Sequence, residues 1–184
     1  MNLPDYFSKY SKLISQPGVT TALEGLAELM IRAKHAGGKV ILAGNGASAS
    51  ISSHLATDFS KQAGIRAMAF NDANLITALG NDYGYEKWIS KALELYGEKG
   101  DILILISSSG KSPNVVDAAR TAKALGLSVV AFTGFDRFNP LGEIAEHHFW
   151  VDSRAYNIVE CVHMIWLTGV CDLIIGDSEY TVSG

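Results

Sequence analysis

Short apolar runs alternate with helical patterns along the whole chain. Five runs rich in β-branched residues predict strands at about 39–43, 65–70, 102–106, 127–133 and 148–151. Apolar residues recur at helical spacing over about 20–35, 50–62, 85–95, 114–125 and 157–175. The run from Ile102 to Ile106 is apolar at every position, which is typical of a parallel strand covered by helices on both faces. The pattern therefore predicts an α/β fold, a three-layer α-β-α sandwich around a five-stranded parallel sheet.

Length and composition predict one domain. The chain has 184 residues, of which 48% are hydrophobic and 18% are charged, close to the averages of globular proteins. No internal repeat, low-complexity tract or proline-rich linker divides it. We expect a single domain over 1–184, in which 1–36 form a helical lead-in.

Charge, the first residues and the cysteines indicate the partners and the cellular compartment of the protein. The net charge is -4 and no stripe of Lys and Arg is present, so we expect no direct nucleic-acid partner. The first residues lack the basic and apolar parts of a secretion signal, and no uninterrupted apolar run suggests a membrane span. Cys161 and Cys171 lack metal-type spacing and are expected to be buried free thiols. These features predict a cytoplasmic protein.

The first candidate ligand loop is Gly44-Asn45-Gly46-Ala47-Ser48, between a predicted strand and a predicted helix. Its glycines let the backbone approach a ligand closely, and free N–H groups at a helix start favour an anion. The third glycine of a dinucleotide fingerprint is absent, because Ala49 stands in its place. We therefore expect no nucleotide cofactor.

The second candidate loop is Ser107-Ser108-Ser109-Gly110-Lys111-Ser112, again after a strand and before a helix. Hydroxyls and backbone N–H donors can surround a phosphate without a metal ion, and the nucleotide-binding P-loop pattern is missing. An ordinary capped helix start would explain either loop alone. Two such loops on adjacent parallel strands would converge at one edge of the sheet, which predicts a phosphate site.

Two pairs of chemically active residues lie on predicted helices. His54 and Asp58 are four residues apart, and Glu160 and His163 are three apart, so each pair lies on one helix face. Imidazole and carboxylate are ligands that suit zinc. Solvated or core polar residues would show the same spacing, so the pattern alone leaves both interpretations open.

The order of three motifs resembles the sugar isomerase (SIS) domain family, and the phosphoheptose isomerases in particular. The motifs are Gly44-Asn45-Gly46-x-Ser48, Gly80-Asn81-Asp82-Tyr83-Gly84 and Ser107-Ser108-Ser109-Gly110-x-Ser112. The resemblance implies a flavodoxin-like topology and a homotetramer with sites between subunits. It also implies that Ser107, Ser108, Ser109 and Ser112 hold the phosphate of a phosphorylated sugar. The remaining substrate-binding residues would be Asn45, Gly46, Ala47, Ser48, Asn81, Asp82 and Glu160.

The resemblance further implies a zinc site, from which this chain departs in part. The family's first-helix His and Glu match His54 and Asp58, and its last-helix Gln matches Glu160, but Thr168 stands where the final His would be. His54, Asp58 and Glu160 are then the candidate metal ligands, with Asp58 as the candidate catalytic base. An Asp in place of Glu shortens the base, and a misplacement of about 1 Å can cost about a hundredfold in rate.

Two functions follow from this resemblance. One is an aldose–ketose isomerase acting on a phosphosugar such as sedoheptulose 7-phosphate, which the motifs favour slightly. The other is a non-catalytic sugar-phosphate-binding module like the bacterial replication-initiator-associating proteins, which also lack the final His and share a tail similar to Val170-Cys-Asp-Leu-Ile174. The two differ in whether turnover occurs.

Overall fold

A five-stranded parallel sheet forms the centre of the molecule. The computed structural model describes residues 2–179. The strands are β1 (Val40–Gly44), β2 (Ala67–Ala69), β3 (Ile102–Ser107), β4 (Ser128–Thr133) and β5 (His147–Trp150). They pair in the order β2-β1-β3-β4-β5, and every pairing is parallel. This order confirms the predicted fold class and its flavodoxin-like topology.

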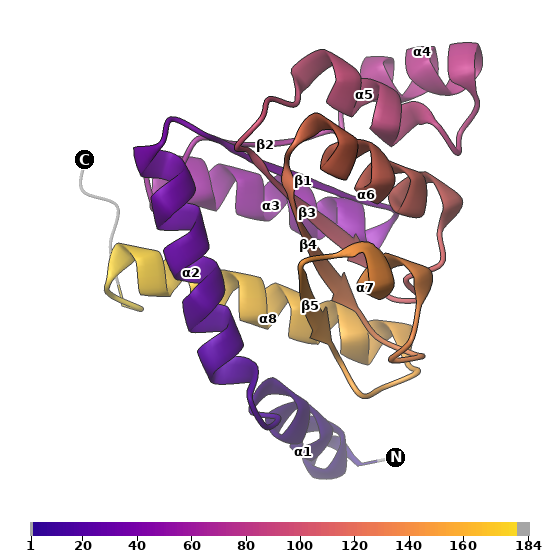
Figure 1. Ribbon diagram of the computed structural model, residues 1–184. Helices are drawn as coiled ribbons and strands as arrows, with labels where there is room; N and C mark the ends of the chain where they lie inside the picture. The colour runs from indigo at the N-terminus through magenta and orange to yellow at the C-terminus, as the bar shows by residue number, and fades with distance from the viewer. Residues whose placement is uncertain (1, 180–184) are drawn as a thin grey trace.

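Helices cover both faces of the sheet (Figure 1). They are α1 (Leu3–Ile14), α2 (Val19–His35), α3 (Ala47–Lys61), α4 (Ala73–Tyr83), α5 (Trp88–Tyr96), α6 (Pro113–Leu125), α7 (Pro140–Ile144) and α8 (Tyr156–Ile175). Side chains alternate along each strand, so Val40 and Leu42 pack with the cluster formed by α2, α3 and α8. Ile41 and Ala43 face the opposite cluster, formed with α4 to α7. The two clusters are the two interfaces of a three-layer sandwich.

Helices α4 and α7 lie outside the predicted set, and α1 lies in the expected helical lead-in of 1–36, for which no helix was given before about residue 20. Helix α1 starts where the Asn2 side chain accepts from the N–H of Asp5, and it projects from the body (Figure 1). It buries no residue completely, and Leu3 and Phe7 are each 59% exposed. Helix α4 contains Gly80 in its interior, where glycine opposes helix formation by about 1 kcal/mol. Helix α7 is only five residues long, too short to show a helical period.

Helix α8 shows how an apolar helix serves a soluble domain. By length and composition it could cross a membrane, since its most apolar stretch has a mean hydropathy of 1.8. In the structure Val159, Trp166 and Val170 on one face pack into the core with α2 and α3. This packing is that of a core helix in a soluble protein. One expectation was wrong: Cys171 is buried, but Cys161 is exposed, because it lies on the opposite side of the same helix.

Candidate functional site

The loops that follow β1 and β3 meet at the carboxyl edge of the sheet. These two strands are neighbours, and Gly44 lies opposite Ile106 in their register. Strand order reverses between them, which is the position where open α/β sheets bind ligands. A Cβ on Gly44 would lie 2.6 Å from the Cβ of Ser48 and 2.7 Å from the carbonyl oxygen of Ile106. Only glycine lets the two loops approach this closely.

A small pocket lies between these loops and the start of α8. Its volume is about 110 Å³. Both loops and α8 contribute to its walls, which are formed by Asn45, Ser48, Ile106, Ser107, Ser108, Ser109, Ser112, Tyr156 and Glu160. Seven of these nine residues were predicted to bind substrate, so the structure brings most of the predicted set together.

One hydroxyl of this pocket has no partner, and the others make few contacts: Ser109 Oγ accepts from the N–H of Lys111 at 3.2 Å. Ser108 is 5% exposed, and its Oγ has no hydrogen-bond partner among the described residues. Ser112 precedes α6 at the capping position but its side chain makes no capping hydrogen bond there, and its Oγ lies 3.4 Å from that of Ser107. A capping hydrogen bond therefore does not explain Ser112. A buried hydroxyl without a partner is costly, so the pocket suits an oxygen-rich anion that would accept from it.

The serine loop is held in shape from behind by α7. Gly110 has a positive φ of 63°, and a Cβ at this position would overlap the side chain of Asn139. Asn139 is 1% exposed and accepts from the N–H of Gly142 at 2.9 Å. The N–H of Leu141 donates to the carbonyl oxygen of Gly110 at 3.1 Å. The loop is therefore preorganised before any ligand binds.

Lys111 is paired with Asp136. Its Nζ donates to Asp136 at 2.9 Å, and Arg154 contacts the same carboxylate. The hydrogen bond from Lys111, followed by the charge of Arg154, lowers the pKa of Asp136. Attraction for an anion in the pocket therefore comes chiefly from hydroxyls and from the N-terminal end of α6.

Asn45 makes contacts that the sequence did not reveal. Its side-chain amide exchanges two hydrogen bonds with that of Asn114, at 2.9 and 3.0 Å, and also accepts from the Tyr85 hydroxyl at 3.0 Å. Asn114 and Tyr85 were not predicted site residues, and neither was Tyr156 in the pocket wall. Only the place of Asn114, two residues after Ser112 in the first turn of α6, could have drawn attention to it.

The other predicted sugar-side residues are spread more widely. Ser48 is buried in the pocket wall, whereas Gly46 and Ala47 lie exposed at the start of α3. Asn81 and Asp82 are exposed in the last turn of α4, where Asn81 donates to Asp82 at 2.8 Å. These last two do not line the pocket within one chain, so their part in binding stays a prediction.

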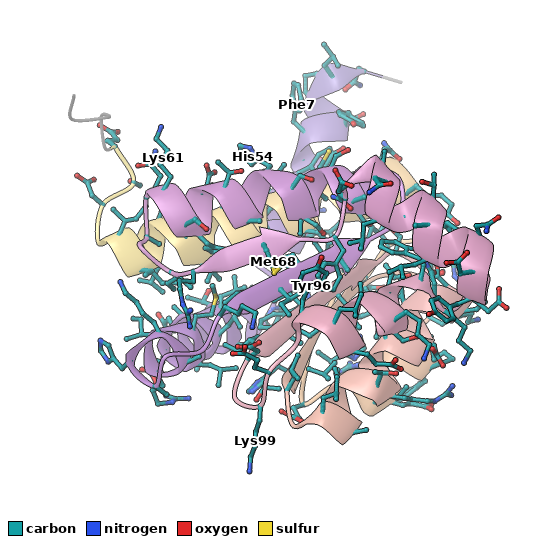
Figure 2. All side chains as sticks on the ribbon, turned by 90° about the horizontal axis from the view of Figure 1, so that it is seen from above. Phe7, His54, Lys61, Met68, Tyr96 and Lys99 are labelled. Atoms are coloured by element: carbon teal, nitrogen blue, oxygen red, sulfur yellow. The ribbon has the colours of Figure 1, made fainter. Side chains whose placement is uncertain are left out.

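His54 and Asp58 lie together, away from the pocket. His54 Nε2 is 3.1 Å from Asp58 Oδ2, and the two side chains are 55% and 23% exposed. Figure 2 shows His54 on the outer side of α3, pointing away from the sheet. Asp58 follows Ser48 by ten residues, which corresponds to about 15 Å along a helix. Asp58 lies near the far end of α8, where burial and then this carboxylate raise the pKa of Cys171 to about 12.

The predicted metal ligands do not meet within one chain. Among residues 2–179, no group of three or more His, Cys, Asp or Glu side chains is placed to hold a metal ion. Glu160 lines the pocket, eleven residues before Cys171 and therefore about 16 Å away along α8. Two ligands from one helix are too few for a zinc site, so this donor set does not fit zinc within a single chain.

His163 is a structural histidine. It is completely buried, and its Nε2 lies 3.0 Å from the carbonyl oxygen of Thr133, to which it must donate. Burial lowers the pKa of His163 to about 4, so the ring is neutral near pH 7. This contact ties α8 to the carboxyl end of β4 and helps to fix Glu160 in the pocket wall.

Comparisons with known proteins identify the family of this chain. The SIS domain family matches residues 5–134. The phosphoheptose isomerase of Burkholderia pseudomallei strain 1710b is 37% identical over 178 residues, covering 94% of this chain and 88% of the relative. A solved phosphoheptose isomerase from Neisseria gonorrhoeae superposes with a TM-score of 0.87 at 27% identity, covering 95% of this chain and 97% of that one. Another from Francisella tularensis gives a TM-score of 0.86 at 27% identity, with the same coverage. The chain belongs to the SIS domain family.

Proposed function

We propose that this protein is an aldose–ketose isomerase that acts on a phosphorylated sugar, with sedoheptulose 7-phosphate as its substrate. The observation that carries the proposal is the serine-lined pocket at the switch point of the sheet, with the unpartnered Ser108 hydroxyl inside it. The similarity to proteins named phosphoheptose isomerase supports the choice of substrate. It also favours the enzyme over the non-catalytic binding module.

Substrate binding follows from the pocket. The phosphate accepts hydrogen bonds from the hydroxyls of Ser108, Ser109 and Ser112, and the N-terminal end of α6 favours its negative charge. Glu160 and Tyr156 border the same pocket from α8. They contact the sugar next to the phosphate, and the Glu160 carboxylate accepts from sugar hydroxyls. The phosphate thus anchors one end of the substrate.

Isomerisation moves a proton between neighbouring carbons, so it needs a base at the reacting carbon. We assign this role to Asp58, which His54 orients through their 3.1 Å contact. Asp58 lies about 15 Å along α3 from the Ser48 end of the pocket. The reacting carbon and Asp58 can therefore meet only if another subunit completes the site.

A homotetramer is accordingly part of the proposal. Leu3 and Phe7 of α1 are largely exposed, and Ile165 and Leu173 on the outer side of α8 are 42% and 50% exposed. Apolar surface of this kind is typical of a face that another subunit covers. Light scattering at micromolar concentration tests it: a mass near four times 19.7 kDa is expected, and a stable monomer would contradict it.

We extend the proposal to zinc only at such a subunit interface. There, His54 and Asp58 of one subunit could join Glu160 of another, a nitrogen and two carboxylates of the kind that zinc binds. No step proposed above depends on the ion. We also place the protein in the cytoplasm, because an exposed free thiol such as that of Cys161 suits a reducing compartment.

The test is an assay of purified protein with sedoheptulose 7-phosphate, run with and without added zinc. Turnover in either condition supports the isomerase. Absence of turnover on any heptose or hexose phosphate, together with intact phosphosugar binding by calorimetry, would instead indicate the binding module. A variant with Ser109→Ala and Ser112→Ala should bind at least about tenfold more weakly, because two hydrogen bonds to a charged group are lost. Unchanged affinity would remove the pocket from the proposal.

A further inference from the structure

Three ligand-side segments that are far apart in the sequence meet at one side chain. Asn45 follows β1, Asn114 stands 69 residues later at the start of α6, and Tyr85 lies between α4 and α5. Asn45 and Asn114 each donate to the other, at 3.0 and 2.9 Å. Asn114 is 2% exposed, so its half of this pair is shielded from water. The pair joins the β1 loop to the helix that begins directly after the serine loop.

The hydrogen-bonding capacity of Asn45 is nearly used up by these contacts. An asparagine side chain offers two N–H donors and an oxygen with two acceptor positions. The oxygen of Asn45 accepts from both Asn114 and Tyr85, and one of its N–H groups donates to Asn114. A single N–H remains for a ligand. Asn45 therefore serves mainly to hold the loops, and it can donate to a sugar oxygen but cannot accept from a sugar hydroxyl.

Tyr85 extends the contact to the third motif. It comes directly after the Gly80–Gly84 segment, whose residues Asn81 and Asp82 lie outside the pocket. The ring of Tyr85 is largely exposed, at 57%, and lies near that of Trp88. Its hydroxyl donates to Asn45 at 3.0 Å. This bond ties the segment between α4 and α5 to the ligand edge of the sheet.

We propose that Asn114 and Tyr85 are positioning residues of the phosphosugar site. Through the Asn45 amide they fix the relative positions of the β1 loop, the start of α6 and the connection between α4 and α5. The inference rests on the proposed function, because it assigns them to the same pocket. Neither residue lines the pocket, so neither is expected to touch the phosphate. Asn114 fixes the β1 loop against the start of α6, and Tyr85 fixes the α4–α5 connection against both.

The decisive variant is Asn114→Asp, because its effect should depend on pH. A protonated carboxyl group presents one donor and one acceptor in the geometry of the lost amide, whereas an ionised one is only an acceptor and opposes the Asn45 oxygen. Burial and this opposed oxygen raise the pKa of the new carboxyl above its usual value of about 3.9. Calorimetry with sedoheptulose 7-phosphate should show binding about tenfold weaker than wild type at pH 8. The deficit should shrink steadily as the pH falls to 5.

Controls separate this role from general destabilisation. Asn114→Ala should bind about tenfold more weakly at every pH, because no protonation can restore its contacts. Asn74→Asp, an exposed change elsewhere, should match wild type throughout. Each variant is compared with wild type at the same pH, since the ionisation of the sugar phosphate changes over this range in every experiment. A deficit of Asn114→Asp that does not respond to pH, or no deficit at all, overturns the paired-amide role.

Tyr85→Phe tests the third segment. It keeps the ring and removes the hydroxyl, so affinity for sedoheptulose 7-phosphate should fall about threefold while affinity for inorganic phosphate stays unchanged. The matched control is Tyr96→Phe, an exposed tyrosine at the end of α5 and outside the three motifs. Equal effects of both changes would overturn the role of Tyr85. If wild type binds neither ligand, the proposed function itself fails and the inference falls with it.

Discussion

A single chain supplies all the walls of the serine pocket, but it supplies only part of the site proposed around the His54–Asp58 pair. The pocket takes its walls from two strand-end loops and α8, and Asn139 and Asn114 brace those loops from behind. His54 lies on the outer side of α3 (Figure 2), and its imidazole contacts Asp58 of the same helix. The serine pocket is therefore complete within one chain, whereas the His54–Asp58 pair is partly exposed to solvent.

The difference follows from where each group sits in the fold. Residues directly after parallel strands are fixed by the register of the sheet, so loops on β1 and β3 converge without further help. His54 is half-exposed on a covering helix, away from the strand ends, and what it meets there depends on the next subunit. Phosphate binding should therefore belong to the single chain, whereas proton transfer should depend on assembly.

The largest expected effect is on turnover by Asp58→Asn. If Asp58 is the base, the amide cannot take the proton, and kcat should fall by about 10²- to 10⁴-fold. Affinity for sedoheptulose 7-phosphate should remain within about twofold, because Asp58 lies outside the pocket. Initial rates and calorimetry on the same preparation measure both quantities. A loss of rate without a loss of affinity would show that proton transfer and phosphate binding depend on different residues.

A matched change at an exposed carboxylate serves as the control. Asp177→Asn, just beyond α8, removes the same charge and should leave turnover unchanged. An Asp58→Asn variant that turns over normally would exclude Asp58 as the base. One that loses binding as well as rate would show that the two regions are not separate.

The second prediction concerns stability, because α8 carries a residue of the pocket and also reaches Asp58. His163 is neutral and buried, with a pKa of about 4 against about 6.5 when unfolded. The unfolded chain thus binds the proton more readily, and the stabilisation is complete above about pH 6.5 and is lost as the pH falls toward 4. Between pH 7 and pH 5 the free energy of unfolding should drop by about 2 kcal/mol from this group.

Urea unfolding at the two pH values measures this loss, with two variants for comparison. His163→Gln can still donate to Thr133, and should reduce the pH dependence while lowering stability at pH 7. The pKa of His148 is also lowered, by burial and then by Arg137, so a smaller dependence of the same sign should remain. His35→Gln, at an exposed position on α2, should keep the full pH dependence. A wild-type stability that is flat from pH 7 to 5 would refute the assignment.

The fold was largely predictable because the apolar pattern within each short segment indicates whether that segment is a strand or a helix. Runs such as Ile102–Ile106 show double-sided burial in the sequence itself, and the strand order agrees with the expected topology. Helix α4 was missed because Gly80 and Asn81 oppose helix formation locally, and packing of Leu79 against the core overrides that tendency. Helix α1 lies within the expected helical lead-in of 1–36, although its own bounds were not predicted.

The site was predictable where it depends on strand ends and less so elsewhere. The serine loop follows β3 directly, so its place needed only the strand. The contacts of Tyr85 and Asn114 with Asn45 span 40 and 69 residues, and nothing in their local sequence indicates such a partner. The spacing of His54 and Asp58 predicted their pairing. It could not predict their distance from Glu160, which depends on how α3 and α8 pack.

The smallest expected effect is at Glu160, the residue common to the pocket and to the predicted catalytic set. Its carboxylate borders the same small cavity as the phosphate-binding serines, so it should repel a phosphate dianion. Glu160→Gln removes that charge and keeps a similar shape. Because the group is half-exposed, screening limits the gain, and inorganic phosphate should bind about threefold more tightly at low salt. The gain should shrink at 0.5 M salt, and Glu146→Gln, an exposed change of the same charge, should show none.

Calorimetry at two salt concentrations decides between two arrangements of Glu160. Tighter binding would place Glu160 beside the phosphate, as the pocket walls indicate. Weaker binding would mean instead that the carboxylate is needed to position the serine loop.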